Sequence, residues 1–155
     1  MNNVNKWTVI LIAGVVAIAA FLFLPLMSVS YGGTELASAT GMDYVSGEVE
    51  LSYMGQTQTI EVELTFDMII MLVAGAVAIF ASYKKSVMSA LIAGGVGFVI
   101  TLINIFDAPG GDAMAGGSVS LGLGIWVPLI CYAGIAALAW ILKKEQQAAP
   151  TEIQQ

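Results

Sequence analysis

The sequence predicts an integral membrane protein, in which an all-α bundle of four membrane-spanning helices carries a small extracytoplasmic β-sheet formed by the outer loops. The 155 residues are 58% hydrophobic and only 10% charged, whereas a soluble domain is about 45–50% apolar and about 25% charged. Four apolar stretches reach the roughly 17–25 residues that a helix needs to cross a bilayer. Between the first two stretches, apolar and polar residues alternate at successive positions, which predicts strands.

The four helices are expected at residues 7–26, 66–83, 87–106 and 124–142. None carries an ionisable residue in its middle, since Asp67 and Asp107 lie at helix ends. Ion pathways and proton relays usually place ionisable residues inside the membrane, so an ion-coupled transporter is disfavoured.

The first stretch can also be interpreted as a cleaved signal peptide, with Lys6 before it and Ala-Ser-Ala at 37–39 as a cleavage site. Its apolar run is longer than the usual length of about 7–15 residues, and Ala39 lies far beyond its end. We therefore expect this segment to be retained as a membrane span.

The lysines predict the orientation. Lys6 precedes the first span, Lys84 and Lys85 lie between the second and third, and Lys143 and Lys144 follow the fourth. With four crossings, all five lie on one side, which the positive-inside rule assigns to the cytoplasm. We expect a multi-pass protein of the plasma (inner) membrane with both termini in the cytoplasm.

The acidic residues are expected mainly on the other side of the membrane. The nine that lie outside or at the outer interface are Glu35, Asp43, Glu48, Glu50, Glu61, Glu63, Asp67, Asp107 and Asp112. The net charge of −6 therefore describes an acidic outer face combined with a mildly basic inner one.

The chain is expected to form a single domain with three parts outside the helices: an outer loop at 27–65 that contains strands, a second outer loop at 107–123 and a disordered cytoplasmic tail at 143–155. Segments 27–31 and 118–121 are expected to extend the sheet of the first loop, because a lone hairpin is marginal in water.

Residues 48–64 are predicted to form a β-hairpin. Apolar residues recur at every second position in both arms, at Val49, Leu51 and Tyr53 and at Ile60, Val62 and Leu64, as in half-buried strands. Gly55 favours a two-residue type II′ turn. That turn would pair Glu50 with Glu61 and Glu48 with Glu63, placing the glutamates on one face and the apolar residues on the other.

The candidate functional surface consists of Glu48, Glu50, Glu61 and Glu63. Three interpretations remain open: a solvated polar face, a docking surface for a basic partner, or a weak site for a divalent cation such as Ca²⁺, which prefers oxygen ligands. Asp67, after a candidate N-cap at Thr65, either stabilises the helix N-terminus or attracts cations to a pore mouth.

Several side chains within the spans are expected to serve packing. The small-residue pairs Ala13/Ala17, Ala74/Ala78 and Ala90/Gly94 predict close helix contacts, and Thr101 and Asn104 are expected to bond to a neighbouring helix. The candidates for an aromatic belt at the membrane interface are Trp7, Tyr83, Trp126, Tyr132 and Trp140.

In its order of helices and outer loops, the chain resembles the tetraspan claudin-type architecture, in which both outer loops contribute to one extracellular sheet. The resemblance covers most of the chain but concerns topology only. The first outer loop lacks the tryptophan, the Gly-Leu-Trp and the paired cysteines of claudins, so no functional residue is transferred. With its Leu24-Pro25-Leu26 exit from the first helix, the chain also resembles small bacterial four-helix membrane proteins, a likeness that implies no activity.

The composition restricts the function. The chain has five lysines, no arginine and no histidine, and Cys131 is its single cysteine. This argues against nucleic-acid binding, histidine-based catalysis, Cys/His zinc sites and disulfides within the chain. We expect a non-enzymatic protein without catalytic residues, cofactor or metal centre.

We expect the protein to act through its acidic outer domain as an interaction, structural or accessory subunit of the cell envelope. Its expected partners are the lipid bilayer and either further copies of the chain or another membrane protein. The alternative is an oligomeric channel or transporter component with a cation-attracting outer face. A membrane enzyme that uses only Asp or Glu on lipid-linked substrates is a third, weaker alternative.

Overall fold

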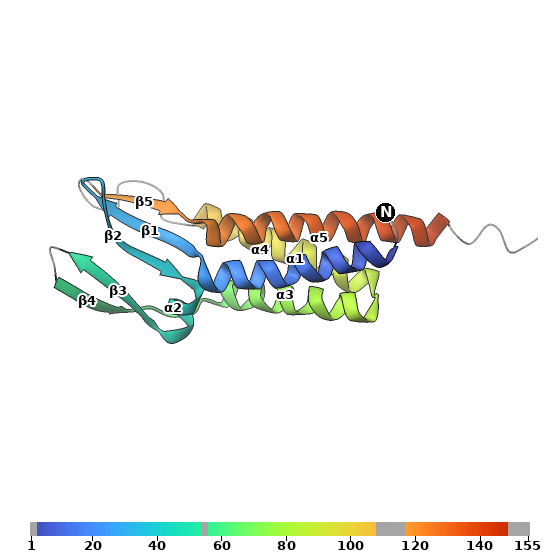
Figure 1. Ribbon diagram of the computed structural model, residues 1–155, viewed down its shortest axis with the longest axis horizontal. Coiled ribbons are helices and arrows are strands. Elements are labelled where there is room, and N and C mark those ends of the chain that lie inside the picture. The colour runs from blue at the N-terminus through green and yellow to red at the C-terminus, as the bar shows by residue number, and fades with distance from the viewer. Residues whose placement is uncertain (1–2, 54–55, 108–116, 149–155) are drawn as a thin grey trace, which may run out of the picture.

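Four long helices lie side by side, and five strands gather at one end of them (Figure 1). The computed structural model of the chain describes residues 3–53, 56–107 and 117–148. The long helices are α1 (Asn3–Phe23), α3 (Phe66–Lys84), α4 (Val87–Asp107) and α5 (Leu123–Ala148). All four are long and apolar enough to cross a membrane. The prediction of four such helices combined with antiparallel strands is therefore confirmed.

Three helix boundaries differ from the prediction by more than one residue. The first helix was expected to begin at residue 7, but α1 begins at Asn3. The first helix was expected to reach residue 26, but α1 ends at Phe23 and a strand begins at Pro25, because proline lacks an N–H and disfavours helical geometry in the residue before it. The predicted disordered tail was expected to begin at residue 143, but α5 continues to Ala148 through strong helix formers. The rest of that predicted tail lies outside the described residues.

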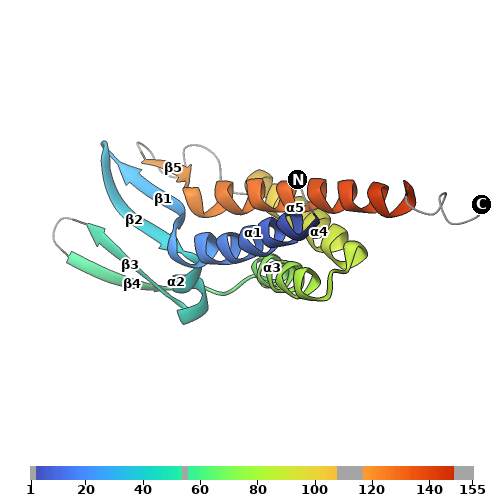
Figure 2. The same cartoon turned by 45° about the vertical axis from the view of Figure 1, so that its right-hand side comes forward.

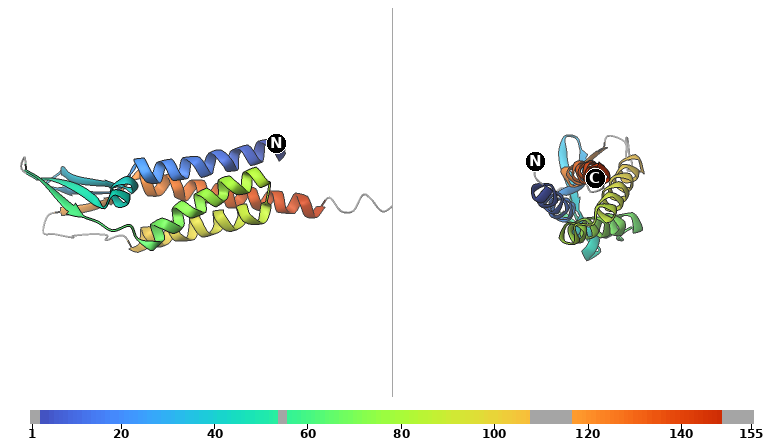
Figure 3. Two further views of the ribbon diagram at one scale, coloured as in Figure 1. Left: turned by 90° about the horizontal axis from the view of Figure 1, so that it is seen from below. Right: turned by 90° about the vertical axis from the view of Figure 1, so that its right-hand side faces the viewer.

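Small side chains allow the helices to pack closely, and Figure 3 shows the four of them end-on. Ala17, Ala78 and Ala90 are fully buried. A Cβ atom on Gly94 of α4 would lie only 2.6 Å from the backbone nitrogen of Ala136 in α5. The predicted small residues thus serve contacts between helices of this chain.

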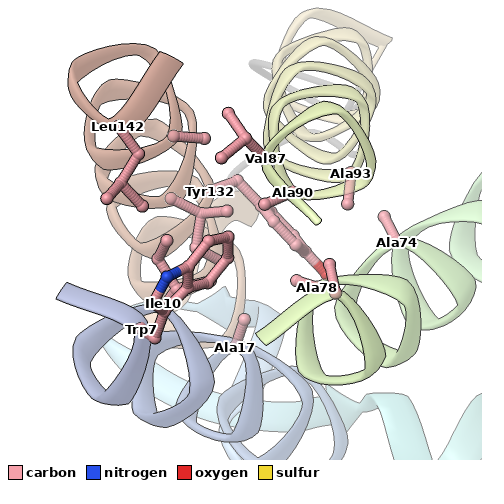
Figure 4. Packing of buried hydrophobic residues seen from close by; sticks show 13 residues of the cluster. Trp7, Ile10, Ala17, Ala74, Ala78, Val87, Ala90, Ala93, Tyr132 and Leu142 are labelled. Atoms are coloured by element: carbon pink, nitrogen blue, oxygen red, sulfur yellow. The ribbon is translucent and has the colours of Figure 1, made fainter. Parts of the chain in front are cut away.

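Tyr132 of α5 lies among the buried side chains of the bundle and is 1% exposed (Figure 4). Its hydroxyl donates a hydrogen bond to the backbone oxygen of Met71 in α3, at 2.5 Å. A Cβ atom on Gly97 of α4 would lie 2.6 Å from the tyrosine ring. Tyr132 therefore joins three helices. Tyr132 and Trp7 are both buried, so neither faces outward as a residue of an aromatic belt would.

The polar residues of α4 bond mainly within their own helix. Thr101 donates to the oxygen of Gly97 at 2.7 Å, and Asn104 donates to the oxygen of Ile100 at 2.9 Å. The carbonyl one turn earlier is the nearest acceptor for such side chains. Asn104 also lies 3.9 Å from the sulfur of Met71 in α3, so the expected contact with a neighbouring helix holds for Asn104 alone.

The strands form two sheets instead of the predicted single sheet. The three-stranded sheet has the order β2 (Thr34–Thr40), β1 (Pro25–Tyr31), β5 (Gly117–Leu121), and the second sheet pairs β3 (Glu48–Tyr53) with β4 (Gln56–Glu61). All neighbours are antiparallel. The segments that were expected to extend the hairpin therefore pair with each other and with β2, a strand that the sequence analysis missed.

A short helix, α2 (Gly41–Ser46), connects the two sheets (Figure 2). Thr40 and Asp43 form a reciprocal capping box at its start, and Gly47, with a φ of 85°, ends it in the left-handed conformation. A Cβ atom on Gly41 would lie 2.5 Å from the backbone oxygen of Phe21. This contact seats α2 against the last turn of α1, at the junction between helices and strands.

Candidate functional site

The two ends of the molecule differ in charge. The strand end carries the two sheets, and the lysine end carries Lys6, Lys84, Lys85, Lys143 and Lys144, which lie at the other ends of the helices. Glu48, Glu50, Glu61 and Glu63 are all exposed at the strand end. The predicted candidate surface is therefore accessible, and we call these four residues the acidic hairpin surface.

The register of the hairpin differs from the prediction by two residues. Glu48 pairs with Glu61, and Glu50 pairs with Thr59, whereas the predicted turn paired Glu48 with Glu63. The N–H of Val62 donates to the oxygen of Gly47 at 2.9 Å, which fixes the base of the hairpin directly after α2. Because strand side chains alternate between faces, a shift of two residues leaves Glu48, Glu50 and Glu61 on one face.

Glu63 lies beyond the end of β4, in the connection to α3. It remains exposed and two positions from Glu61. The acidic hairpin surface thus consists of three glutamates on one sheet face and a fourth at its margin. The central turn of this hairpin, at residues 54 and 55, lies outside the described residues.

Among the described residues, no lysine forms an ion pair with this surface. Glu48 and Glu61 lie directly opposite each other, an arrangement that destabilises a strand pair. Residues 27–65 and 107–123 contain no lysine or arginine. Within the described parts of the chain, the ion pair that forms joins Lys6 to Glu145 at the lysine end. The strand end therefore carries a negative field that can steer a cationic partner.

The carboxylates do not converge in the way that a metal site requires. Among residues 3–53, 56–107 and 117–148, no group of three or more acidic or cysteine side chains is placed to hold a metal ion. A Ca²⁺ site collects six to eight oxygen ligands around one point, whereas these glutamates are spread along two strands. The geometry favours an extended surface over a chelating site.

Asp67 lies half-buried in the first turn of α3, as expected. Thr65 occupies the N-cap position with an extended backbone, but its side chain makes no capping hydrogen bond. Thr65 is thus confirmed at the N-cap position, although its side chain does not bond to the helix N-terminus. Asp67 remains as the acidic group that complements the positive end of the helix dipole.

A row of serines on the three-stranded sheet was not recognised as a surface in the sequence analysis. The hydroxyl oxygens of Ser28 and Ser120 lie 2.9 Å apart, and so do those of Ser30 and Ser118. Ser38 of β2 is the register partner of Ser28 on the other side. The signal in the sequence was the alternation of serine in both segments, which gains meaning only once the strands are known to be neighbours.

Tyr44 links α2 to the three-stranded sheet. Its hydroxyl lies 3.8 Å from the sulfur of Met27 in β1. Burial, and to a smaller extent the carboxylate of Asp43, raise the pKa of Tyr44 above the usual value of about 10. The phenol therefore remains neutral in the folded protein at any physiological pH.

Comparison with known proteins finds no family model, no curated protein and no solved structure that matches this chain. The function must accordingly be inferred from the surfaces described above and not from homology.

Proposed function

We propose that this chain is a four-span protein of the plasma membrane whose strand end lies outside the cytoplasm and acts as an interaction module of the cell envelope. Four helices of sufficient length and apolarity support the membrane location. The gathering of all five lysines at the end opposite the strands supports cytoplasmic termini, because cytoplasmic segments carry the excess of lysine and arginine.

The acidic hairpin surface is proposed to bind a basic surface of another envelope protein. The observation that carries this proposal is the exposed pair Glu48 and Glu61, opposed in the register and without a cation from this chain. A basic partner relieves that repulsion and adds electrostatic complementarity, which governs association rate and specificity.

A second copy in the same membrane orientation does not supply such a partner. The segments at the strand end, 27–65 and 107–123, contain no lysine or arginine, and the lysines of a parallel copy lie at its other end. The proposed role is therefore that of an accessory or structural subunit bound to a different protein.

Photo-crosslinking in native membranes tests this role. A photoreactive phenylalanine analogue at Thr59, exposed and paired with Glu50, is expected to form an adduct with a protein of different mass. The adduct should weaken as salt rises and disappear when Glu48, Glu50, Glu61 and Glu63 are all changed to Gln. The matched control, Ser118→Ala with Ser120→Ala, alters the other sheet and should leave it intact. An adduct that survives the loss of all four charges rejects the proposal.

A further inference from the structure

A shallow hollow on the last turns of α5 lies at the lysine end. It has a volume of about 160 Å³ and is lined by Trp140, Lys143, Lys144 and Gln147. Trp140 is 51% exposed, so its ring is free to contact a ligand, and burial of apolar surface is favourable. Nothing in the proposed function of the strand end uses this hollow.

Two ammonium groups converge on the ring of Trp140. The Nζ atom of Lys143 lies 5.8 Å from the ring centroid, and that of Lys144 lies 5.7 Å from it. Each cation is attracted by the face of the indole, but the two cations also repel each other. An anion held in the hollow would reduce this repulsion.

The acidic residue nearest in the helix does not fill that role. Glu145 bonds to Lys6 of α1 instead, and Lys6 is itself buried. Glu145, the one carboxylate in the turn of α5 that follows Lys144, is therefore already paired with Lys6 of α1. The hollow consequently retains two positive charges and the neutral amide of Gln147.

The hollow also lies where the apolar surface of α5 gives way to its charged end. Ile130, Trp126 and Ile141 are exposed apolar side chains on this helix, and the sequence turns to Lys-Lys-Glu-Gln-Gln directly after Leu142. A ligand with an anionic head and apolar chains matches both parts. We infer that this hollow binds the phosphodiester headgroup of an anionic phospholipid, with the acyl chains along α5. This inference concerns a different end of the molecule from the acidic hairpin surface.

Lipid binding by the detergent-purified full chain, measured by native mass spectrometry, tests the inference. The chain is expected to retain phosphatidylglycerol in preference to zwitterionic phosphatidylcholine. Each lysine near a membrane surface contributes about 1 kcal/mol to attraction of anionic lipid, so Lys143→Gln with Lys144→Gln should lower the affinity for phosphatidylglycerol on the order of thirtyfold.

The matched control is Lys84→Gln with Lys85→Gln, an adjacent pair at the same end in which Lys84 lies 5.8 Å from the ring of Phe80. It should lower the affinity for phosphatidylglycerol much less, because neither of its lysines lines the hollow. An equal loss in both double variants would show a general surface charge and overturn the site. Equal retention of both lipids would overturn the selection for an anionic headgroup.

A second variant separates the lipid from free phosphate. Trp140→Ala keeps both lysines and should still reduce phosphatidylglycerol binding, because it removes the ring and part of the hollow; unchanged binding would contradict the inference. Inorganic phosphate is expected to compete weakly. Displacement of the lipid by phosphate at equal concentration would identify a site for the soluble anion and would overturn the assignment to lipid.

Discussion

Gly97 and Tyr132 set the distance between α4 and α5 at the centre of the bundle. The tyrosine ring occupies the space in which a side chain at position 97 would stand, and its hydroxyl reaches across to α3. Tyr132 thus fills the space between α3, α4 and α5. Position 97 requires glycine because the tyrosine ring leaves no room for a Cβ atom.

Gly97→Ala is expected to destabilise the bundle by about 1–3 kcal/mol, the usual cost of overpacking a filled core. Gly95→Ala, on the same helix, is the control, since a Cβ atom there meets nothing within 4 Å and alanine favours helix. Unfolding in mixed micelles titrated with SDS measures both variants. Equal stability of the two would contradict the packing described for Tyr132.

Tyr44 predicts a pH dependence at the junction of helices and strands. Its pKa is raised in the folded state, so the stabilisation from its neutral phenol is present below the unfolded pKa of about 10 and is lost as the pH rises through the folded pKa. Thermal unfolding from about pH 8 to about pH 11 should show a steeper alkaline loss of stability for the wild type than for Tyr44→Phe. Identical slopes would exclude this role of Tyr44.

The long helices could be predicted because apolar length alone identifies them, while the arrangement of the strands could not. Between its two terminal threonines, β2 (Thr34–Thr40) contains only Glu, Leu, Ala and Ser, so its interior lacks the β-branched and aromatic residues typical of a strand. It becomes a strand because Gly32 and Gly33, both with positive φ, turn the chain back along β1.

For the acidic hairpin surface, the sequence could predict that the glutamates share one face of the hairpin, but it could not predict which residues of β3 and β4 pair. Alternation places Glu48 and Glu50 on one face in any register, and every register of the same parity adds Glu61 to that face. The register itself depends on Gly47, which ends α2 and accepts the hydrogen bond from Val62. That contact is set by the tertiary position of α2, which the local pattern does not contain.

Engineered disulfides test the register. In a Cys131→Ala background, Val49→Cys with Ile60→Cys places the two cysteines directly opposite each other, closer than a diagonal pair such as Val49 and Val62, and a disulfide needs a short separation. The pair should oxidise readily and shift in mobility on a non-reducing gel. Val49→Cys with Val62→Cys, the pairing expected from the sequence, should oxidise poorly. The opposite ranking would restore that earlier register.

At the scale of the whole molecule, the segregation of charge predicts the orientation in the membrane. A cysteine in place of Thr57, exposed on β4, should react with a membrane-impermeant thiol reagent in intact cells. A cysteine in place of Gln147, exposed near the end of α5, should react only after permeabilisation. Cys131→Ala again provides the background. Labelling of both positions in intact cells would refute the proposed orientation.

The packing of the bundle predicts that a single copy does not conduct ions. Ala78, Ala90 and Tyr132 are buried where the helices meet, so an oligomeric channel would need a path between copies. Because the proposed role is that of a subunit bound to a different protein, liposomes containing the purified protein should show no cation flux above empty liposomes. Flux that vanishes when the four glutamates of the acidic hairpin surface become glutamines would instead establish the channel alternative.

The position of β1 between β2 and β5 has a consequence for biosynthesis. β2 follows β1 after a two-residue turn. The strand on the other side of β1 is made much later, since Ser120 of β5, which lies beside Ser28, is 92 positions further along the chain. While the ribosome makes α3 and α4, one edge of β1 stays open, and open strand edges recruit other chains. The nascent protein is therefore vulnerable to misassembly until β5, which follows α3 and α4 in the chain, has been made and can pair with β1.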